Sequence, residues 1–134
     1  VRVVEFQTPT YERLIIAFAQ QVRTQDHWDS EAAIDGLQLD PSATRQSTPI
    51  APGLEALGEC TDFSAWRVTL QPDTRTSLPL SLPYAVCINI RGSILINGLR
   101  RDQFEGCFVP ACSMPVVLEN NTSAAAQCLV ASQP

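Results

Sequence analysis

From Phe63 onward, the chain is divided into short apolar runs separated by Gly, Pro and Asn residues. Such runs, rich in β-branched and aromatic side chains and bounded by turn residues, are typical of β-strands. Asn97-Gly98 is the clearest turn signal, because a type I′ hairpin turn needs positive φ at both central residues. We therefore expect strands within residues 62–70, 83–90, 92–96, 99–104, 106–110, 115–119 and 124–131. Many short strands at close spacing predict an all-β sandwich or small barrel over residues 61–134.

The residues before this region divide into a mixed segment, 1–39, and a linker. Residues 1–6 read as a strand, and residues 31–37 predict a short helix. The stretch between them, from Tyr11, fits both a helical stripe and strand alternation, and its β-branched and aromatic content favours a strand. Residues 40–60 contain three Pro together with Ser, Thr and Gly, which predicts a linker. Because the chain opens on Val within a strand-like run, we expect it to be part of a longer protein.

The composition excludes several classes of function. The 134 residues carry nine basic and fourteen acidic side chains, a net charge of −5, which disfavours nucleic acid as a partner. All nine basic residues are Arg, so Schiff-base lysines and a P-loop lysine are absent. His27 is the single histidine, so a metal site built from several histidines is excluded. No apolar run is long enough to span a membrane, and we expect no membrane partner.

Five cysteines are present, an odd number without a CxxC motif, so no zinc ribbon or thioredoxin-type site is indicated. Cys87, Cys107 and Cys128 lie in apolar runs, where cysteine behaves as a small hydrophobic residue. We expect buried free thiols, with a disulfide or metal role as the alternative. Free thiols favour a reducing compartment, which predicts a cytoplasmic protein.

Polar residues around the predicted helix have structural explanations. His27 lacks a nucleophile motif such as G-x-S-x-G and is interpreted as a packing or capping residue. Asp29 or Ser30 caps the helix. The carboxylates of Asp26, Asp29 and Glu31 lack the spacing of a calcium loop, and the helix dipole explains acidic residues at this point.

Arg100 and Arg101 follow the Asn97-Gly98 turn directly. Two adjacent guanidinium groups could bind a phosphate or a carboxylate. Charged residues also protect the edge strand of a sheet from pairing with other chains. We favour the edge-strand interpretation and keep anion binding as the alternative.

Two stretches of the C-terminal half, IRGSILING at 90–98 and GCFVPA at 106–111, resemble the small jelly-roll barrel of the cupins. The run VVEFQTPTYERLIIAF at 3–18 resembles the strand of type I mannose-6-phosphate isomerases that follows their last metal ligand. Residues 62–111 resemble the C-terminal cupin domain of the same family. The resemblance implies an all-β cupin-type jelly-roll barrel, with an N-terminal strand and short-helix segment packed against it. Residues 1–39 would include the closing strand of an upstream catalytic domain.

The resemblance also implies where metal ligands should be. In the isomerase family zinc is held by Gln, Glu and two His, all upstream of the stretch that matches residues 3–18. Cupin ligand positions counted from Gly92 and Pro110 are taken here by apolar residues: Leu78, Leu80, Ala85 and Pro115. None of these side chains can donate to a cation. We expect no metal and no cofactor in this chain, and zinc only in the parent enzyme.

One catalytic residue of the family has a counterpart here. The family motif Thr-Tyr-Arg carries an active-site Arg, and this chain reads Thr10-Tyr11-Glu12-Arg13, one residue longer. A one-residue shift in a strand moves a side chain to the opposite face. Either a bulge returns Arg13 to the site, or Glu12 occupies the position and the role is lost. Arg13 is therefore the one candidate catalytic residue, and the alternative is an ordinary arginine on a solvated strand face.

Together these features imply the non-catalytic C-terminal cupin portion of a mannose-6-phosphate isomerase-like protein. The parent would interconvert mannose 6-phosphate and fructose 6-phosphate, and the isolated chain would be inactive. The alternatives are a metal-free cupin module that binds a sugar or a small apolar ligand, and an oligomerisation module. The expected partners are the upstream catalytic domain, a sugar phosphate and a second copy of the chain.

Overall fold

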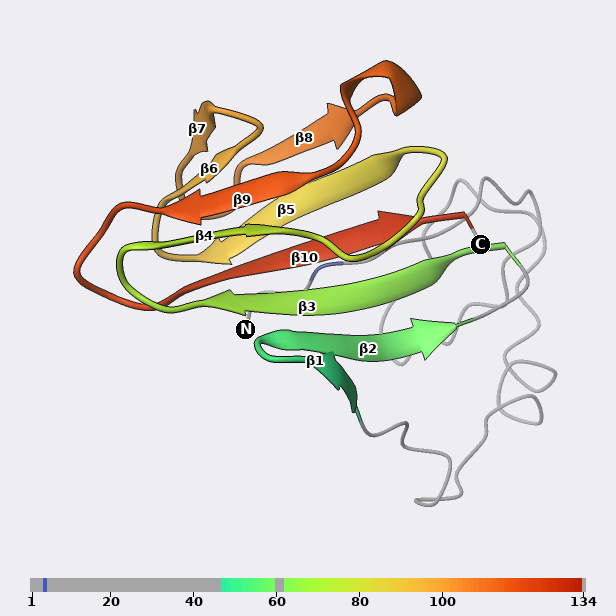
Figure 1. Ribbon diagram of the computed structural model, residues 1–134, viewed down its shortest axis with the longest axis horizontal. Helices are drawn as coiled ribbons and strands as arrows, with labels where there is room; N and C mark the ends of the chain where they lie inside the picture. The colour runs from blue at the N-terminus through green and yellow to red at the C-terminus, as the bar shows by residue number, and fades with distance from the viewer. Residues whose placement is uncertain (1–3, 5–46, 60–61, 134) are drawn as a thin grey trace, which may run out of the picture. The chain divides into compact units, whose positions relative to one another are not determined.

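The computed structural model describes Val4, residues 47–59 and residues 62–133, and every strand in it belongs to one compact unit, Arg45–Pro134. The strands form two antiparallel sheets, one of six strands in the order β1-β2-β3-β10-β5-β8 and one of four in the order β4-β9-β6-β7 (Figure 1). Their bounds are β1 Thr48–Ala51, β2 Leu54–Glu59, β3 Ser64–Leu70, β4 Thr74–Ser77, β5 Ala85–Arg91, β6 Ile94–Ile96, β7 Leu99–Arg101, β8 Gly106–Val109, β9 Val117–Asn120 and β10 Ala126–Ser132. One 3₁₀ turn, Ala111–Ser113, follows β8. The all-β prediction is confirmed for this unit.

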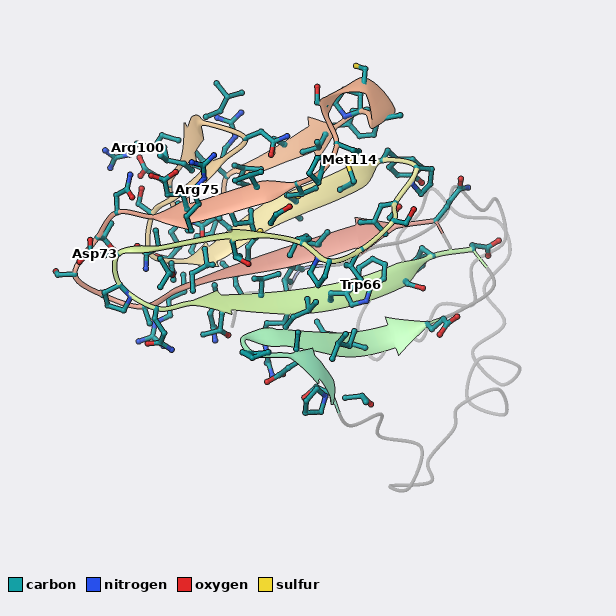
Figure 2. The ribbon with its side chains drawn as sticks, viewed as in Figure 1. Trp66, Asp73, Arg75, Arg100 and Met114 are labelled. Atoms are coloured by element: carbon teal, nitrogen blue, oxygen red, sulfur yellow. The ribbon has the colours of Figure 1, made fainter. Side chains whose placement is uncertain are left out.

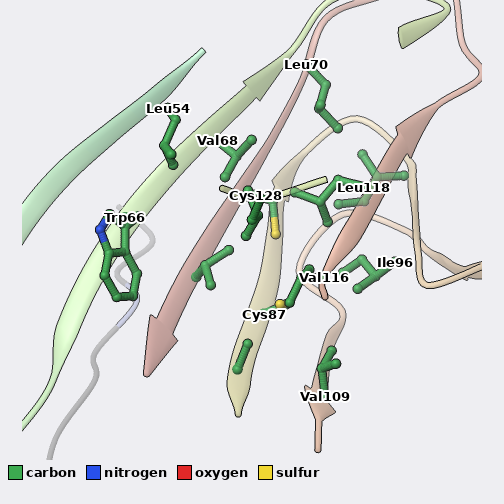
Figure 3. Close-up of a cluster of buried hydrophobic side chains, with 14 of the residues drawn as sticks. Leu54, Trp66, Val68, Leu70, Cys87, Ile96, Val109, Val116, Leu118 and Cys128 are labelled. Carbon is green, nitrogen blue, oxygen red and sulfur yellow. The ribbon is translucent and has the colours of Figure 1, made fainter. Parts of the chain in front are cut away.

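The core consists of the alternate residues that the two sheets turn toward each other. In β3, Ser64, Trp66, Val68 and Leu70 are buried while the residues between them are half-buried. Buried residues alternate in the same way along β5 and, up to Val130, along β10, as expected when one face of a sheet is covered. Figure 3 shows these side chains meeting residues of the four-stranded sheet such as Ile96 and Leu118, which are almost fully buried.

The predicted hairpin turn is confirmed. Asn97 and Gly98 have φ values of 47° and 80° and connect β6 to β7, as a type I′ turn requires. The Asn97 side chain also donates to the carbonyl oxygen of Ser113 at 2.6 Å and accepts from the amide of Val117 at 2.7 Å. The turn is therefore tied to the segment that leads into β9.

The linker predicted for residues 40–60 differs from the structure at residues 48–59. These residues form β1 and β2, and β2 pairs with β3 in the six-stranded sheet. Pro52-Gly53, interpreted as a linker signal, makes the turn between them, with Gly53 at φ 73° and its carbonyl accepting from Thr69 at 2.7 Å. A Cβ at Gly53 would lie 2.5 Å from the Thr69 carbonyl oxygen, so close approach as well as φ requires glycine here.

The seven strands expected after residue 61 are all present, and a further strand, β4, was not predicted. Its residues are polar and alternate between half-buried and exposed, which gives no apolar run to recognise. The pairing with β9 at the edge of the four-stranded sheet determines its structure. The predicted strand and helix within residues 1–39 lie outside the described residues. Among those described, no helix is long and apolar enough to cross a membrane.

Asn120, the last residue of β9, is fully buried. Its amide nitrogen donates to the carbonyl oxygens of Gln71 at 3.0 Å and Ala124 at 2.8 Å. Its oxygen accepts from the backbone and hydroxyl of Thr122 at 3.0 and 2.8 Å. A buried amide with all these partners fixes the β9–β10 turn against the end of β3.

Candidate functional site

The four positions where the resemblance places cupin metal ligands lie at the end of the barrel where β4 ends and β5 and β9 begin. Leu78 and Ala85 belong to the buried core, with 5% and 0% of their surface exposed, and Leu80 packs against it. Ala85 lies opposite Val109 in the β5–β8 ladder. Pro115, the fourth position, is exposed, so Leu78 and Ala85 are the two of these positions that hydrocarbon fills inside the barrel.

The donor chemistry of this end does not fit a cation. Divalent metals in proteins are bound by imidazole, thiolate, carboxylate or carbonyl groups, and alkyl side chains supply none of these. The backbone amide of Leu78 is also used, donating to the carbonyl oxygen of Val116 at 3.0 Å. Within the described part of the chain, no group of three or more His, Cys, Asp or Glu residues is arranged to hold a metal ion. No catalytic step through zinc can be built on these residues.

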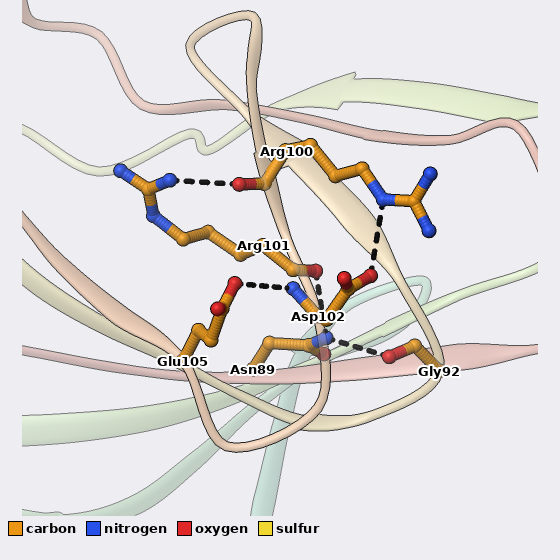
Figure 4. A network of polar contacts seen from close by, with 6 residues as sticks. All are labelled: Asn89, Gly92, Arg100, Arg101, Asp102 and Glu105. Atoms are coloured by element: carbon orange, nitrogen blue, oxygen red, sulfur yellow. Dashed lines mark hydrogen bonds and ion pairs between the residues drawn. The ribbon is translucent and has the colours of Figure 1, made fainter.

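The opposite end of β5 is polar, and Asn89 is its centre (Figure 4). Asn89 is fully buried and donates from its amide nitrogen to the carbonyl oxygens of Gly92 at 2.7 Å and Arg101 at 3.1 Å. The backbone amide of Asp102 donates to the Glu105 carboxylate at 2.8 Å. These bonds join β5, the start of β6, the end of β7 and the loop before β8. The network holds the β7–β8 loop in place.

The structure describes four cysteines, all of them free thiols, and three of the four are buried or half-buried. Cys87 and Cys128 are fully buried and Cys107, opposite Cys87 on β8, is half-buried. The prediction of buried free thiols is confirmed for Cys87 and Cys128, while Cys112 is free and exposed.

The surroundings of Cys87 and Cys107 favour the protonated thiol. Hydrogen bonding to the Cys128 thiol, followed by burial, raises the pKa of Cys87 above its usual value. Burial raises the pKa of Cys107, and the neighbouring Cys87 adds to this, although Arg101 opposes it. Because the thiolate is the reactive species, these cysteines are suited to packing and not to nucleophilic catalysis.

The edge-strand interpretation of Arg100 and Arg101 is confirmed, because β7 is the last strand of the four-stranded sheet among the described residues. Arg100 is exposed, and its Nε donates to Asp102 Oδ1 at 3.0 Å. Hydrogen bonds from Ser93 and then from Arg100 hold the pKa of Asp102 below its usual value. Arg101 donates to the Arg100 carbonyl oxygen at 2.7 Å, across the same network. The two guanidinium groups therefore have different environments and do not act as one anion-binding pair.

The outer face of the four-stranded sheet carries a row of side chains that the sequence did not reveal. Arg75 of β4 lies opposite Glu119 of β9, Glu119 opposite Leu95 of β6, and Leu95 opposite Arg100 of β7. The residues flanking this row in β6 and β9 are buried, so the row itself faces outward. These four residues are far apart in the sequence: Arg75 and Arg100 are separated by 25 positions, and Glu119 lies further along the chain. The order of the strands in the sheet brings them together.

Several candidates from the sequence lie outside the described residues. They are Arg13 and its alternative Glu12, His27, and the carboxylates of Asp26, Asp29 and Glu31. Cys60 also falls there. The roles suggested for them stay predictions.

The comparisons with known proteins bear on the fold. No protein-family model and no curated protein matches the chain. A Cupin 2 conserved barrel domain protein from Salinispora arenicola superposes with a TM-score of 0.50 at 16% identity, covering 87% of this chain and 90% of its own. The plu4264 protein from Photorhabdus luminescens gives a TM-score of 0.51 at 16% identity, covering 73% and 86%. The fold is a cupin-type jelly-roll barrel.

A third similar structure is described as a sugar phosphate isomerase from a cupin superfamily, from Silicibacter pomeroyi. Its TM-score is 0.45 at 18% identity, and it covers 73% of this chain and 76% of its own. Identities at this level extend to the fold alone, because one fold carries many functions. The two structures described first confirm the expectation of a cupin barrel, whereas the narrower resemblance to mannose-6-phosphate isomerases stays a proposal.

Proposed function

We propose that this chain is the non-catalytic cupin portion of a mannose-6-phosphate isomerase-like protein. An upstream catalytic domain of the same protein would hold zinc and interconvert mannose 6-phosphate and fructose 6-phosphate. The observation that carries the proposal is the pair of buried hydrocarbon side chains, Leu78 and Ala85, at the cupin ligand positions. The resemblance of residues 3–18 and 62–111 to the isomerase family supports the identity of the parent.

The chemistry of an aldose–ketose isomerase explains why these positions matter. Proton transfer next to a sugar carbonyl passes through an enediolate, and a bound cation stabilises the negative charge that develops on its oxygens. Among the described residues, the cluster that contains Ala85 and Val109 consists of hydrophobic side chains, which offer no charge for that task. The barrel therefore contributes to the parent by packing, and the isolated chain is inactive.

An isomerase assay tests this directly. The full chain is incubated with mannose 6-phosphate and added zinc, and fructose 6-phosphate is measured against a blank containing a metal chelator. We expect no difference between the two. Turnover above the blank that scales with the chain concentration and persists through a second purification step would contradict the proposal.

A second candidate function, association with another copy of the chain, is supported by Phe108. This side chain is 61% exposed on β8, the last strand of the six-stranded sheet among the described residues. Its ring lies 5.5 Å from that of Tyr84, so the two form an aromatic surface beside an open strand edge. A strand edge with exposed aromatic side chains favours pairing with another chain.

Light scattering on the full chain tests this association. We expect a dimer that Phe108→Glu converts to monomer, because a charge at the edge opposes strand pairing. Leu99→Glu is the matched control, since Leu99 is 60% exposed but lies on β7 of the other sheet. A monomeric wild-type chain, or a dimer that both variants weaken equally, would overturn the candidate.

A further inference from the structure

The outer face of the four-stranded sheet is hollowed where the row Arg75–Glu119–Leu95–Arg100 meets the turn after β9. The cavity measures about 220 Å³ and is lined by Ser93, Leu95, Arg100, Glu119, Asn121 and Thr122, with part of Ile94. Figure 2 shows the labelled side chains of Arg75 and Arg100 on the side of the molecule formed by this sheet. Pockets for drug-sized ligands measure about 300–1,000 Å³, so this one would take a smaller molecule.

The Arg100 side chain lines this cavity and is 71% exposed. Its Nε donates to Asp102, and Asp102 is itself hydrogen-bonded by Ser93. The backbone that follows Arg100 is held by two bonds: Asn89 donates to the Arg101 carbonyl oxygen, and the Asp102 amide donates to Glu105 (Figure 4). The two terminal nitrogens of Arg100 donate to no residue that the structure describes. A positioned guanidinium with two unused nitrogens is a ready hydrogen-bond donor for a ligand oxygen.

The charges around the cavity cancel. Arg100 is paired with Asp102 at 3.0 Å, and Arg75 lies 3.8 Å from the Glu119 carboxylate. Two positive and two negative groups leave no net field to attract an anion. The cavity therefore favours a neutral ligand over a phosphate or a carboxylate.

The remaining groups indicate which kind of neutral ligand. Glu119 accepts hydrogen bonds, Arg100 donates them, and the Asn121 amide can do both. The Thr122 hydroxyl uses its proton within the β9–β10 turn and can accept. The Leu95 side chain is half-buried at the floor between them and offers an apolar surface. A molecule with several hydroxyl groups on a carbon ring matches this arrangement, because each hydroxyl both donates and accepts.

We propose that this outer cavity is a binding site for a small neutral polyhydroxylated molecule of the monosaccharide class. The site is separate from the barrel interior, and it does not depend on the proposed function. Binding through a few solvent-exposed hydrogen bonds is weak, so the dissociation constant falls in the millimolar range.

Amide NMR titration of the full chain tests the proposal, with D-mannose as the probe. We expect saturable shifts of Ser93, Leu95 and Asn121 that are absent around Ala85. Arg100→Gln weakens binding about ten-fold, the change that corresponds to about 1.4 kcal/mol. Arg91→Gln is the matched control, because Arg91 is an exposed arginine at the end of β5 and does not line the cavity.

The same titration is repeated with other classes of ligand. Inorganic phosphate, mannose 6-phosphate and glycine should each shift these amides less than D-mannose at equal concentration. Saturable binding of phosphate or glycine in preference to D-mannose would overturn the proposal, as would D-mannose shifts that Arg100→Gln leaves unchanged. The absence of saturable shifts with every probe would also overturn it. None of these results bears on turnover, so failure here is distinct from failure of the isomerase proposal.

Discussion

The two ends of strand β5 differ in the kind of residue they place inside the barrel. At the start, Ala85 is surrounded by hydrocarbon, including Val109 opposite it. Four residues on, Asn89 is equally buried but donates two hydrogen bonds to backbone carbonyl oxygens. Its side-chain oxygen is buried without a hydrogen-bond partner among the described residues, so only the donor side of this amide is satisfied. The polar end therefore holds its own loops in place, whereas the apolar end packs hydrocarbon among the residues that the structure describes.

The largest effect on stability is expected when a carboxylate, the kind of charged ligand that a metal-binding cupin has there, is placed at the apolar end. Ala85→Glu should lower the free energy of unfolding by about 4 kcal/mol, because an unpaired carboxylate in the core is strongly disfavoured. Burial raises the pKa of such a carboxyl above its unfolded value, so the loss should grow as the pH rises from 4 to about 8. Urea unfolding at several pH values measures both.

Ser77→Glu is the matched control for this substitution. Ser77 is exposed at the end of β4, the strand that precedes β5 in the sequence. The same charge there should change stability by no more than about 0.5 kcal/mol. If Ala85→Glu is as stable as Ser77→Glu, the apolar end is open to water and the contrast between the two ends is wrong.

The polar end can be broken by removing its central amide. Asn89→Leu keeps the approximate volume but leaves the carbonyl oxygens of Gly92 and Arg101 without their donor, and we expect a loss of about 2–3 kcal/mol. Asn121→Leu, at an exposed position, should cost well under 1 kcal/mol. Thermal and urea unfolding compare the two variants. Equal losses would show that the Asn89 network contributes no more than a surface residue.

The reactivity of the cysteine thiols provides a chemical test of burial in the barrel. In the native chain, iodoacetamide should modify the exposed Cys112 on the order of 100-fold faster than the buried Cys87 and Cys128, whose access requires opening of the barrel. Mass spectrometry of peptides over time measures the rates, and alkylation in denaturant is the control. Comparable native rates at Cys87 and Cys112 would contradict a closed interior.

The smallest expected effect concerns Asp102, at the exposed margin of the polar network. Its pKa is held low by a hydrogen bond from Ser93 and by the hydrogen bond and charge of Arg100, so Ser93→Ala and Arg100→Gln should each raise it. A lowered pKa stabilises the fold above the unfolded value near 3.8, and this contribution is lost as the pH falls through the folded pKa. Carboxyl NMR titration of the three proteins measures both shifts. Unchanged values in both variants would remove Asp102 from the network.

How far the sequence predicts this molecule depends on whether a feature is local. The strand containing Trp66 and the Asn97-Gly98 turn follow from alternation and turn chemistry, which neighbouring residues determine. The apolar ligand positions could be located because cupin spacing is counted along the chain. Strands β1, β2 and β4 were missed because Pro-Gly and polar residues look like a loop until a partner strand is known.

The sites were harder to predict than the strands. The row from Arg75 to Arg100 exists only because β9 and β6 lie between them in the sheet, and strand order is not encoded locally. The role of Asn89 also depends on two carbonyl groups that come from other segments. An asparagine at an inward-facing position of a strand indicates such a network. Asn89 lies two residues after Cys87 in β5, so strand alternation places both on the inward face.

Zinc titration followed by methyl NMR tests the central claim, that the barrel interior is closed to metal, most directly. Signals of Leu78 and Ala85 report on the cupin ligand positions, and signals of Val130 report on a buried position in β10. We predict that the methyl resonances of Leu78 and Ala85 do not shift as zinc is added to excess. Stoichiometric shifts of these two residues, with Val130 unchanged, would show that metal enters this end and would contradict the account.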